Sequence, residues 1–174
     1  VTLSNAGYAK PQPIVDYQAQ KRGGRGRSAS AVKEEDYIER LLVASTHDTI
    51  LCFTNMGKVY WLRTFQIPVA SRAARGRPMI NILPLSEDER ITAMLTVDEY
   101  VEDKFVFMAT MNGTVKKTPL MDFSRQRTSG LIAIELEDNN TLIGVAITDG
   151  ESDVMLFSSG GKVIRFKESD VRAI

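Results

Sequence analysis

The chain alternates between short apolar runs and turns rich in glycine, asparagine, aspartate and serine. Clear apolar runs occupy residues 142–147, 154–157 and 163–166, and they are rich in Val, Ile and Phe. Runs of four to seven such residues between turn signals predict β-strands. Residues 33–42 also carry apolar side chains at helical spacing. The repeat described next places a strand at 37–43, so we expect a strand there.

Three landmarks recur along the chain in a fixed order, which indicates an internal repeat. A glycine turn followed by an apolar and basic strand is centred on Gly7, Gly57, Gly113 and Gly161, at spacings of 50, 56 and 48 residues. An arginine-rich loop closes at Gly26, Gly76 and Gly130, which lie 19, 19 and 17 residues after the turn glycines. An acidic or amide-bearing turn then precedes strands at 37–43, 91–95 and 142–147.

Each period holds about four short strands in roughly 50 residues, which is typical of the blades of a β-propeller. We therefore predict an all-β, propeller-like fold of four-stranded blades, with the fourth strand of a period after the arginine loop, as at residues 131–136. A fourth arginine loop would fall after Ile174, so about three and a half blades are present. Residues 1–174 are accordingly expected to be part of one larger domain.

Composition excludes several classes of protein. Hydrophobic residues make up 43% and charged residues 25%, as in soluble globular domains. No apolar run approaches the ~18 residues of a membrane helix, and the first residues do not resemble a signal peptide. The one cysteine, Cys52, is expected to be a packed thiol on a buried strand in a reducing cytosol.

The formal net charge is zero, from 22 basic and 22 acidic residues. A neutral sum argues mildly against nucleic-acid binding, but the charges are clustered. Basic residues group at 21–27, 72–77, 116–117, 125–127 and 162–167, and acids group at 34–39, 87–89, 98–103 and 135–138. One fold can therefore present a positive face and a negative face.

The most specific segment is residues 20–28, which holds four cations and three glycines within nine residues. Glycines allow positive φ and close backbone approach, exposed amides form anion-binding concavities, and arginine grips phosphate with two hydrogen bonds. A Walker A loop does not fit, because Lys21 stands where its first glycine is required and Arg27 replaces its lysine. A dinucleotide fingerprint lacks the preceding apolar strand. A solvated turn is the remaining alternative, against which the recurrence of the loop argues.

The run Gln20, Lys21, Arg22, Gly23, Gly24, Arg25 and Gly26 resembles the "box" motif, Q-R-R-G-G-R-x-G, of the C-terminal domain of the DNA gyrase A subunit. Residues 1–10, 34–51 and 160–172 are also similar to that family, and the resemblance extends over essentially the whole chain. Lys21 departs from the usual arginine, which keeps the charge but loses bidentate geometry.

The resemblance implies a β-pinwheel, a propeller-like disc whose blades exchange a strand, with duplex DNA wrapped around a basic rim without sequence specificity. It implies a non-catalytic domain that supports negative supercoiling by an ATP-dependent type II topoisomerase, in the bacterial cytoplasm at the nucleoid. The implied partners are duplex DNA, the catalytic core of gyrase A and the gyrase B subunit, with self-association of the fragment as a further hypothesis. No cofactor and no metal are expected.

The box residues Gln20 to Gly26 are the first candidates for DNA contact. Further candidates on the rim are Arg27, Arg72, Arg75, Arg77, Lys116, Lys117, Arg125, Arg127, Lys162 and Arg165.

Other side chains are expected to serve structure. His47 is predicted to lie in a turn, Trp61 and Tyr60 to pack in the core or at the rim, and the acidic runs to be solvated. One histidine and no metal-ligand cluster argue against a hydrolase or transferase built on this fold. Two alternatives to gyrase-type wrapping stay open: a protein-interaction propeller that captures an acidic partner, and the related domain of topoisomerase IV, whose box is degraded.

Overall fold

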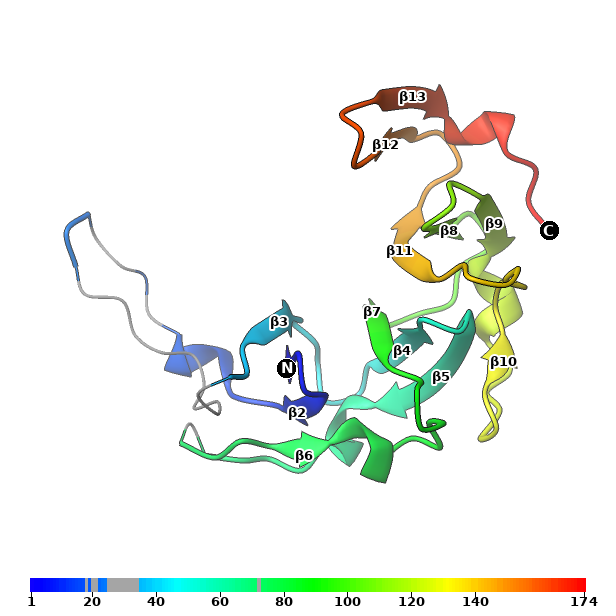
Figure 1. The fold of residues 1–174 in the computed structure, drawn as a ribbon. Helices are drawn as coiled ribbons and strands as arrows, with labels where there is room; N and C mark the ends of the chain where they lie inside the picture. Colours follow the sequence, from blue (N-terminus) through cyan, green and yellow to red (C-terminus); the bar gives the residue numbers. More distant parts are fainter. Residues whose placement is uncertain (18, 20–21, 25–34, 72) are drawn as a thin grey trace.

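The computed structural model describes residues 1–17, 19, 22–24, 35–71 and 73–174. Within these residues the chain folds into four antiparallel sheets that follow one another along an arc (Figure 1). The first sheet has the order β3 (Ile38–Leu41), β1 (Thr2–Ser4), β2 (Tyr8–Lys10), β6 (Arg77–Pro78). The second has the order β7 (Ile91–Val97), β4 (Thr49–Thr54), β5 (Lys58–Arg63), β10 (Leu131–Ile132).

The third and fourth sheets have fewer strands in the described part of the chain. The third has the order β11 (Leu142–Thr148), β8 (Phe105–Thr110), β9 (Val115–Pro119), and the fourth pairs β12 (Asp153–Phe157) with β13 (Val163–Lys167). We refer to the four sheets as blades 1 to 4. The all-β, propeller-like prediction is confirmed, and so is the strand expected at 37–43, which is β3.

Neighbouring blades exchange a strand. β6 follows the arginine loop of the second repeat but pairs with β2 of blade 1, and β10 follows the loop of the third repeat but pairs with β5 of blade 2. The predicted strand at 131–136 is shorter than expected, since β10 is Leu131–Ile132. The ladder ends because the N–H groups of Ala133 and Ile134 both donate to the Gly57 carbonyl, at 2.8 and 3.1 Å.

The repeating hairpins share one turn geometry. In each, the N–H of the turn glycine donates to the carbonyl three residues earlier, at 2.9 to 3.0 Å, and φ lies between +75° and +85°, for Gly7, Gly57, Gly113 and Gly161. Positive φ is the reason that glycine recurs at this position. A 3₁₀ turn follows each second hairpin strand: η1 (Ile14–Asp16), η2 (Thr64–Gln66), η4 (Leu120–Phe123) and η5 (Glu168–Asp170), while η3 (Met79–Asn81) follows β6.

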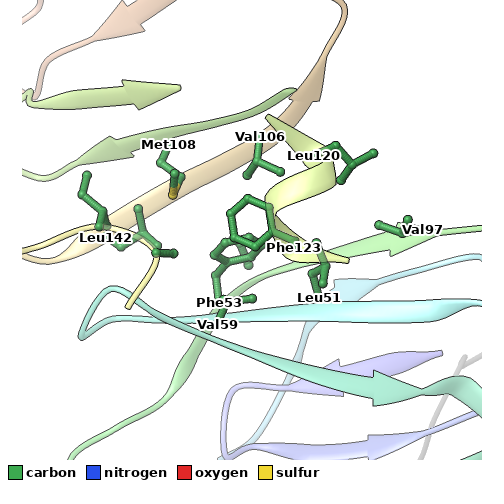
Figure 2. Packing of buried hydrophobic residues seen from close by; sticks show 12 residues of the cluster. Leu51, Phe53, Val59, Val97, Val106, Met108, Leu120, Phe123 and Leu142 are labelled. Atoms are coloured by element: carbon green, nitrogen blue, oxygen red, sulfur yellow. The ribbon is translucent and has the colours of Figure 1, made fainter. Parts of the chain in front are cut away.

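The hydrophobic core lies between blades. All six residues of β4 are buried, because its two faces contribute to two separate clusters. Leu51 and Phe53 pack toward blade 3 with Val106, Met108 and Phe123 (Figure 2). The other face, with Ile50 and Cys52, packs toward blade 1 against a cluster that includes Leu3, Ala9, Tyr60 and Met79. A continuous apolar strand is therefore required where a sheet is covered on both faces.

Equivalent side chains tie blade 2 to blade 3 and blade 3 to blade 4. Trp61 Nε1 of β5 donates to the Phe123 carbonyl in η4 at 2.8 Å, and Lys117 Nζ of β9 donates to the Glu168 carbonyl in η5 at 2.9 Å. Trp61 and Lys117 both stand four residues after their turn glycines. The prediction that Trp61 and Tyr60 are packing residues is confirmed, since Tyr60 is 2% exposed.

Blade 4 is covered on only part of its surface. Met155, Phe157, Val163 and Ile164 are between 51% and 72% exposed, in contrast to the fully buried β4. Phe166 contacts Phe107 of blade 3 with ring centroids 6.3 Å apart. The described residues include no helix of the length and apolarity needed to cross a membrane.

The expectation that the acidic run at 87–89 is solvated is wrong for one residue. Glu89 is 6% exposed and accepts hydrogen bonds from Thr54 Oγ1 at 2.8 Å, the Ser86 N–H at 3.0 Å and Tyr60 Oη at 3.3 Å. Burial by itself would raise the Glu89 pKa, but the Ser86 N–H and the surrounding hydroxyls outweigh it and lower the pKa. Glu87 and Asp88 are exposed, as expected.

We predict that Glu89→Gln lowers the free energy of unfolding by about 1–3 kcal/mol. Its amide nitrogen replaces one of two carboxylate oxygens that both accept hydrogen bonds, Oε1 from Thr54 and Oε2 from Ser86 and Tyr60. A carboxyl with a lowered folded pKa stabilises above its unfolded pKa of about 4.3 and loses that contribution as pH falls through the folded value. The difference between wild type and variant should therefore shrink on acidification. Urea unfolding at several pH values measures it, with exposed Glu87→Gln as the control; equal losses in both variants would contradict the prediction.

Candidate nucleic-acid interface

The arginine loops of the second and third repeats are the segments that carry the chain from one blade to the next. The second loop runs from η2 in blade 2 to β6, and the third runs from η4 in blade 3 to β10. β6 and β10 are edge strands of their sheets, opposite the edges formed by β3 and β7. Figure 1 shows β6 and β10 on the outer side of the arc and β3, β7 and β11 on its inner side. The strand exchange therefore carries both loops to the outer edge.

The closing glycines of these loops are required by close packing. At Gly76, with φ +95°, a Cβ atom would lie 2.4 Å from the Ala9 carbonyl oxygen of blade 1. At Gly130, with φ +77°, it would lie 2.7 Å from the ring of Tyr60 in blade 2. Glycine does allow one backbone to approach another here, as expected from the sequence, but the approached groups belong to the neighbouring blade.

Lys10, on β2 of blade 1, anchors the second arginine loop through hydrogen bonds. Its side chain is 1% exposed, and Nζ donates to the carbonyls of Ser71 at 3.2 Å and Ala74 at 2.8 Å. Lys10 and Tyr60 both stand three residues after their turn glycines, and each meets the arginine loop of the following repeat. A buried ammonium bound to loop carbonyls fixes the course of the segment that carries Arg75.

Several predicted rim cations are exposed. Arg77, Arg125, Arg127 and Lys162 are exposed, and in the described part of the chain none of them forms an ion pair. Arg75 is half-buried, and its guanidinium lies 4.7 Å from the centre of the Tyr8 ring. Burial would raise the pKa of nearby Asp36, but hydrogen bonds from Ser4 and from backbone N–H groups, with the charge of Arg75, lower it.

Three other predicted rim cations are engaged within the protein. Lys117 is 6% exposed, with Nζ bound to the Glu168 carbonyl and 5.0 Å from the Phe105 ring, so the structure does not bring it to the surface. Lys116 is half-buried and donates to the Ala133 carbonyl at 2.9 Å. Arg165 is exposed and paired with Asp153, which raises the arginine pKa through a hydrogen bond and opposite charge.

The structure describes only part of the box. Arg22, Gly23 and Gly24 are exposed, and Gly23 has φ +80°. Apart from its chain neighbours, no described residue has an atom within 4 Å of the place that a Cβ of Gly23 would occupy. Gln20, Lys21, Arg25, Gly26 and Arg27 lie outside the described residues, as does Arg72. The positive φ of Gly23 is the backbone freedom that the sequence predicted for this loop.

The remaining candidates have structural roles. His47 is exposed in a turn, where its carbonyl accepts a hydrogen bond from Arg63 Nη1 at 3.3 Å. Burial raises the pKa of the Cys52 thiol to about 12, so it stays protonated at neutral pH, as expected of a packed thiol. No group of three or more metal-ligating side chains occurs in the ranges that the structure describes.

Sequence reasoning missed Lys10 as a loop anchor. The sequence contained one signal for this role. Lys10 stands three residues after Gly7, as Tyr60 stands three residues after Gly57, so the alternation of side chains along a strand places both on the same face of their blades. It also missed Arg40 and Arg90, which lie together at the inner strands of the blades. Their proximity depends on how blades pack, and no repeat landmark marks it.

Known proteins share the sequence repeats and the fold of this chain. The family model described as "DNA gyrase C-terminal domain, beta-propeller" matches residues 1–45, 48–98, 104–149 and 152–174. Each segment holds the central hairpin of one blade, while the exchanged strands β6 and β10 of blades 1 and 2 fall in the second and third segments. The chain is similar to the DNA gyrase A subunit of Haemophilus influenzae, with 62% identity over 174 residues, 100% of this chain and 20% of that protein. It is 64% identical over 168 residues to the DNA gyrase A subunit of Aeromonas salmonicida, 97% of this chain and 18% of that protein.

Two solved structures have the same fold. The C-terminal domain of DNA topoisomerase IV matches with a TM-score of 0.81 and 27% identity, over 99% of this chain and 52% of the other. The DNA gyrase A C-terminal domain matches with a TM-score of 0.79 and 23% identity, over 99% of this chain and 55% of the other. The chain spans about a fifth of the length of the curated relatives it matches.

We predict that Gly76→Ala destabilises the protein more than Gly113→Ala does. Both glycines have positive φ, +95° and +85°, so both substitutions incur strain of about 1–3 kcal/mol. Gly113 has no atom within 4 Å of the added carbon, whereas Gly76 faces the Ala9 carbonyl, which adds about 1–3 kcal/mol of overpacking. Urea unfolding compares them, and equal losses would show that the crossover is not tightly packed against blade 1.

Proposed function

The chain belongs to the family of DNA gyrase C-terminal domains, and from that premise we propose that it binds duplex DNA without reading its sequence and wraps it around the outer edge of its blades. The observation that carries the proposal is the recurrence of an arginine-bearing crossover loop at the same position of successive repeats. A charge that returns once per blade can meet a bent duplex at successive points along its backbone.

The exposed cations supply the chemistry that phosphate binding requires. Arg77, Arg125 and Arg127 are exposed and lie in or next to crossover loops at the outer edge, without carboxylate partners in the described ranges. Arginine offers a planar fork of donors that matches phosphate oxygens. The box, Gln20 to Gly26, is the first copy of the same loop and has the highest density of cations. We propose it as the principal contact, with Arg22 as its described arginine.

The wrapping proposed here would serve a larger enzyme. We propose that residues 1–174 are part of a larger domain of the same kind, since the chain matches about half of each solved C-terminal domain. This domain would itself be non-catalytic and without cofactor, and would support negative supercoiling by a gyrase-type topoisomerase. Its partners would then be duplex DNA, the catalytic core of gyrase A and the gyrase B subunit, in the cytoplasm at the nucleoid.

Two other functions are alternatives that the experiments below can favour. A protein-interaction propeller is favoured by the net charge of zero, because a neutral protein gains little from long-range attraction to DNA. A topoisomerase IV role is supported by the TM-score of 0.81 to that domain. The box-like segment and the 62% identity to a gyrase A subunit both favour the gyrase-type function.

We predict that the double variant Arg125→Gln/Arg127→Gln weakens duplex binding and reduces the slope of log K against log[salt] by about 2, since each phosphate contact contributes about 0.9. Fluorescence anisotropy with a labelled duplex at several salt concentrations measures both quantities. The loss should be similar for unrelated DNA sequences, because phosphate contacts carry no sequence information.

The matched control is Arg63→Gln/Arg165→Gln, which removes the same charge. Arg63 already donates to the His47 carbonyl, and Arg165 is paired with Asp153. The control should change the salt slope by less than about 1. Equal effects of the two double variants would mean that only overall charge matters, and absence of duplex binding by the wild type would favour the protein-interaction function.

A further inference from the structure

A polar pocket lies where the inner strands of three blades meet, away from the arginine loops. It has a volume of about 150 Å³ and receives residues from blades 1, 2 and 3. Its polar lining consists of Glu39, Arg40, Asn55, Arg90, Thr92 and Thr141. β3, β7 and β11, which supply part of its lining, lie on the inner side of the arc in Figure 1, whereas β6 and β10 lie on the outer side.

Arg40 reaches across a blade boundary to line this pocket. It stands on β3 of blade 1, and its Nη2 donates to the Thr92 carbonyl on β7 of blade 2. The register of the sheets places Ala93 and Gly144 at the equivalent positions of blades 2 and 3. The arginine is therefore peculiar to this junction. Within the described residues, the Arg40 guanidinium forms this one hydrogen bond, which orients the group and leaves its other N–H groups for a ligand.

Arg90 also lines the pocket, and hydrogen bonds to Asn55 hold its backbone in place. Its N–H donates to Asn55 Oδ1 at 2.9 Å, and its carbonyl accepts from the Asn55 N–H at 3.0 Å. The side-chain Nδ2 of Asn55 in turn donates to the Asp88 carbonyl at 3.2 Å. These contacts fix the backbone at the start of β7. The Arg90 side chain therefore starts from a fixed Cα position, although the residue is exposed.

The charge balance of the pocket favours an anion. Two guanidinium groups line it against one carboxylate, Glu39, and among the described residues neither arginine has a carboxylate oxygen within 4 Å. Thr141 of blade 3 is a further polar residue of the lining. Two planar guanidinium groups from different blades suit a ligand that accepts hydrogen bonds in several directions, as the tetrahedral oxygens of phosphate do.

We propose that this inner pocket binds a phosphate group through Arg40 and Arg90, at a site separate from the outer arginine loops. The phosphate is either free in solution or part of a DNA backbone that reaches the inner side of the arc. The site does not depend on wrapping at the outer edge. Because its lining comes from three blades, an occupied pocket would also hold the blades in their observed arrangement.

The first experiment titrates inorganic phosphate and then pyrophosphate into the whole chain, following the arginine Nε–H resonances by NMR. Saturable shifts are expected for Arg40 and Arg90, with binding weakened about tenfold or more in Arg90→Gln, as expected when a charge-assisted hydrogen bond is lost. Arg90→Lys, which keeps the charge, should recover part of the affinity. Arg63→Gln is the matched control, because Arg63 is exposed like Arg90 but does not line the pocket, and its guanidinium donates to the His47 carbonyl at 3.3 Å. Its binding should be unchanged.

A second experiment identifies the source of the phosphate and separates this site from the proposed function. If the ligand is a DNA phosphate, Arg90→Gln lowers the salt slope of duplex binding by about 1 and inorganic phosphate competes with the duplex. If the ligand is free phosphate, Arg90→Gln leaves duplex binding unchanged and loses only the phosphate shifts. The proposal is overturned if neither phosphate titration nor duplex binding distinguishes Arg90→Gln from Arg63→Gln, even when duplex binding itself persists.

Discussion

The donation of a two-residue strand to the preceding blade is the contact on which this structure depends. β6 closes blade 1 and β10 closes blade 2, and each reaches its place through a loop that begins in the next blade. Such a short strand contributes few ladder hydrogen bonds. Its position is held instead by the glycines that close the loops, by Lys10 and Tyr60 beneath them, and by apolar residues such as Met79 and Ala133 that follow directly and enter the core.

This exchange explains why the core lies between blades rather than within them. A strand such as β4 is buried on both faces, with Leu51 and Phe53 on one side and Ile50 and Cys52 on the other. The second sheet is thus shared by two clusters. The hydrogen bonds of Trp61 and Lys117 to the following 3₁₀ turns stabilise the boundaries between blades 2 and 3 and between blades 3 and 4. Packing between the sheets sets the curvature of the arc, so this curvature exists before DNA binds. Bending a duplex around it would therefore not require the protein to become ordered first.

The repeat made much of the fold predictable from sequence. Glycine turns and closing glycines are backbone requirements, so they recur at nearly constant spacing and are visible without knowledge of neighbours. The strand at 37–43 was predicted against its helical pattern because its equivalents at 91–95 and 142–147 have the pattern of strands. Burial was harder to predict. Glu89 and Lys117 were expected at the surface, yet both are buried, since a charged side chain next to a blade boundary finds its hydrogen-bond partners on another element. Arg40 and Arg90 are 50 residues apart in sequence, and only the packing of blades brings them to one pocket.

The central claim is that arginine-bearing crossovers hold a duplex in a bent path, and the most direct measurement is the linking number of closed circular DNA. Nicked circles are ligated with increasing amounts of the chain, at low and moderate salt, alongside a variant with alanine at Lys21, Arg22 and Arg25. Wrapping predicts a dose-dependent shift in linking number that weakens with salt and is lost in the variant. Duplex binding with no shift at any protein concentration, or an equal shift with the variant, would contradict it.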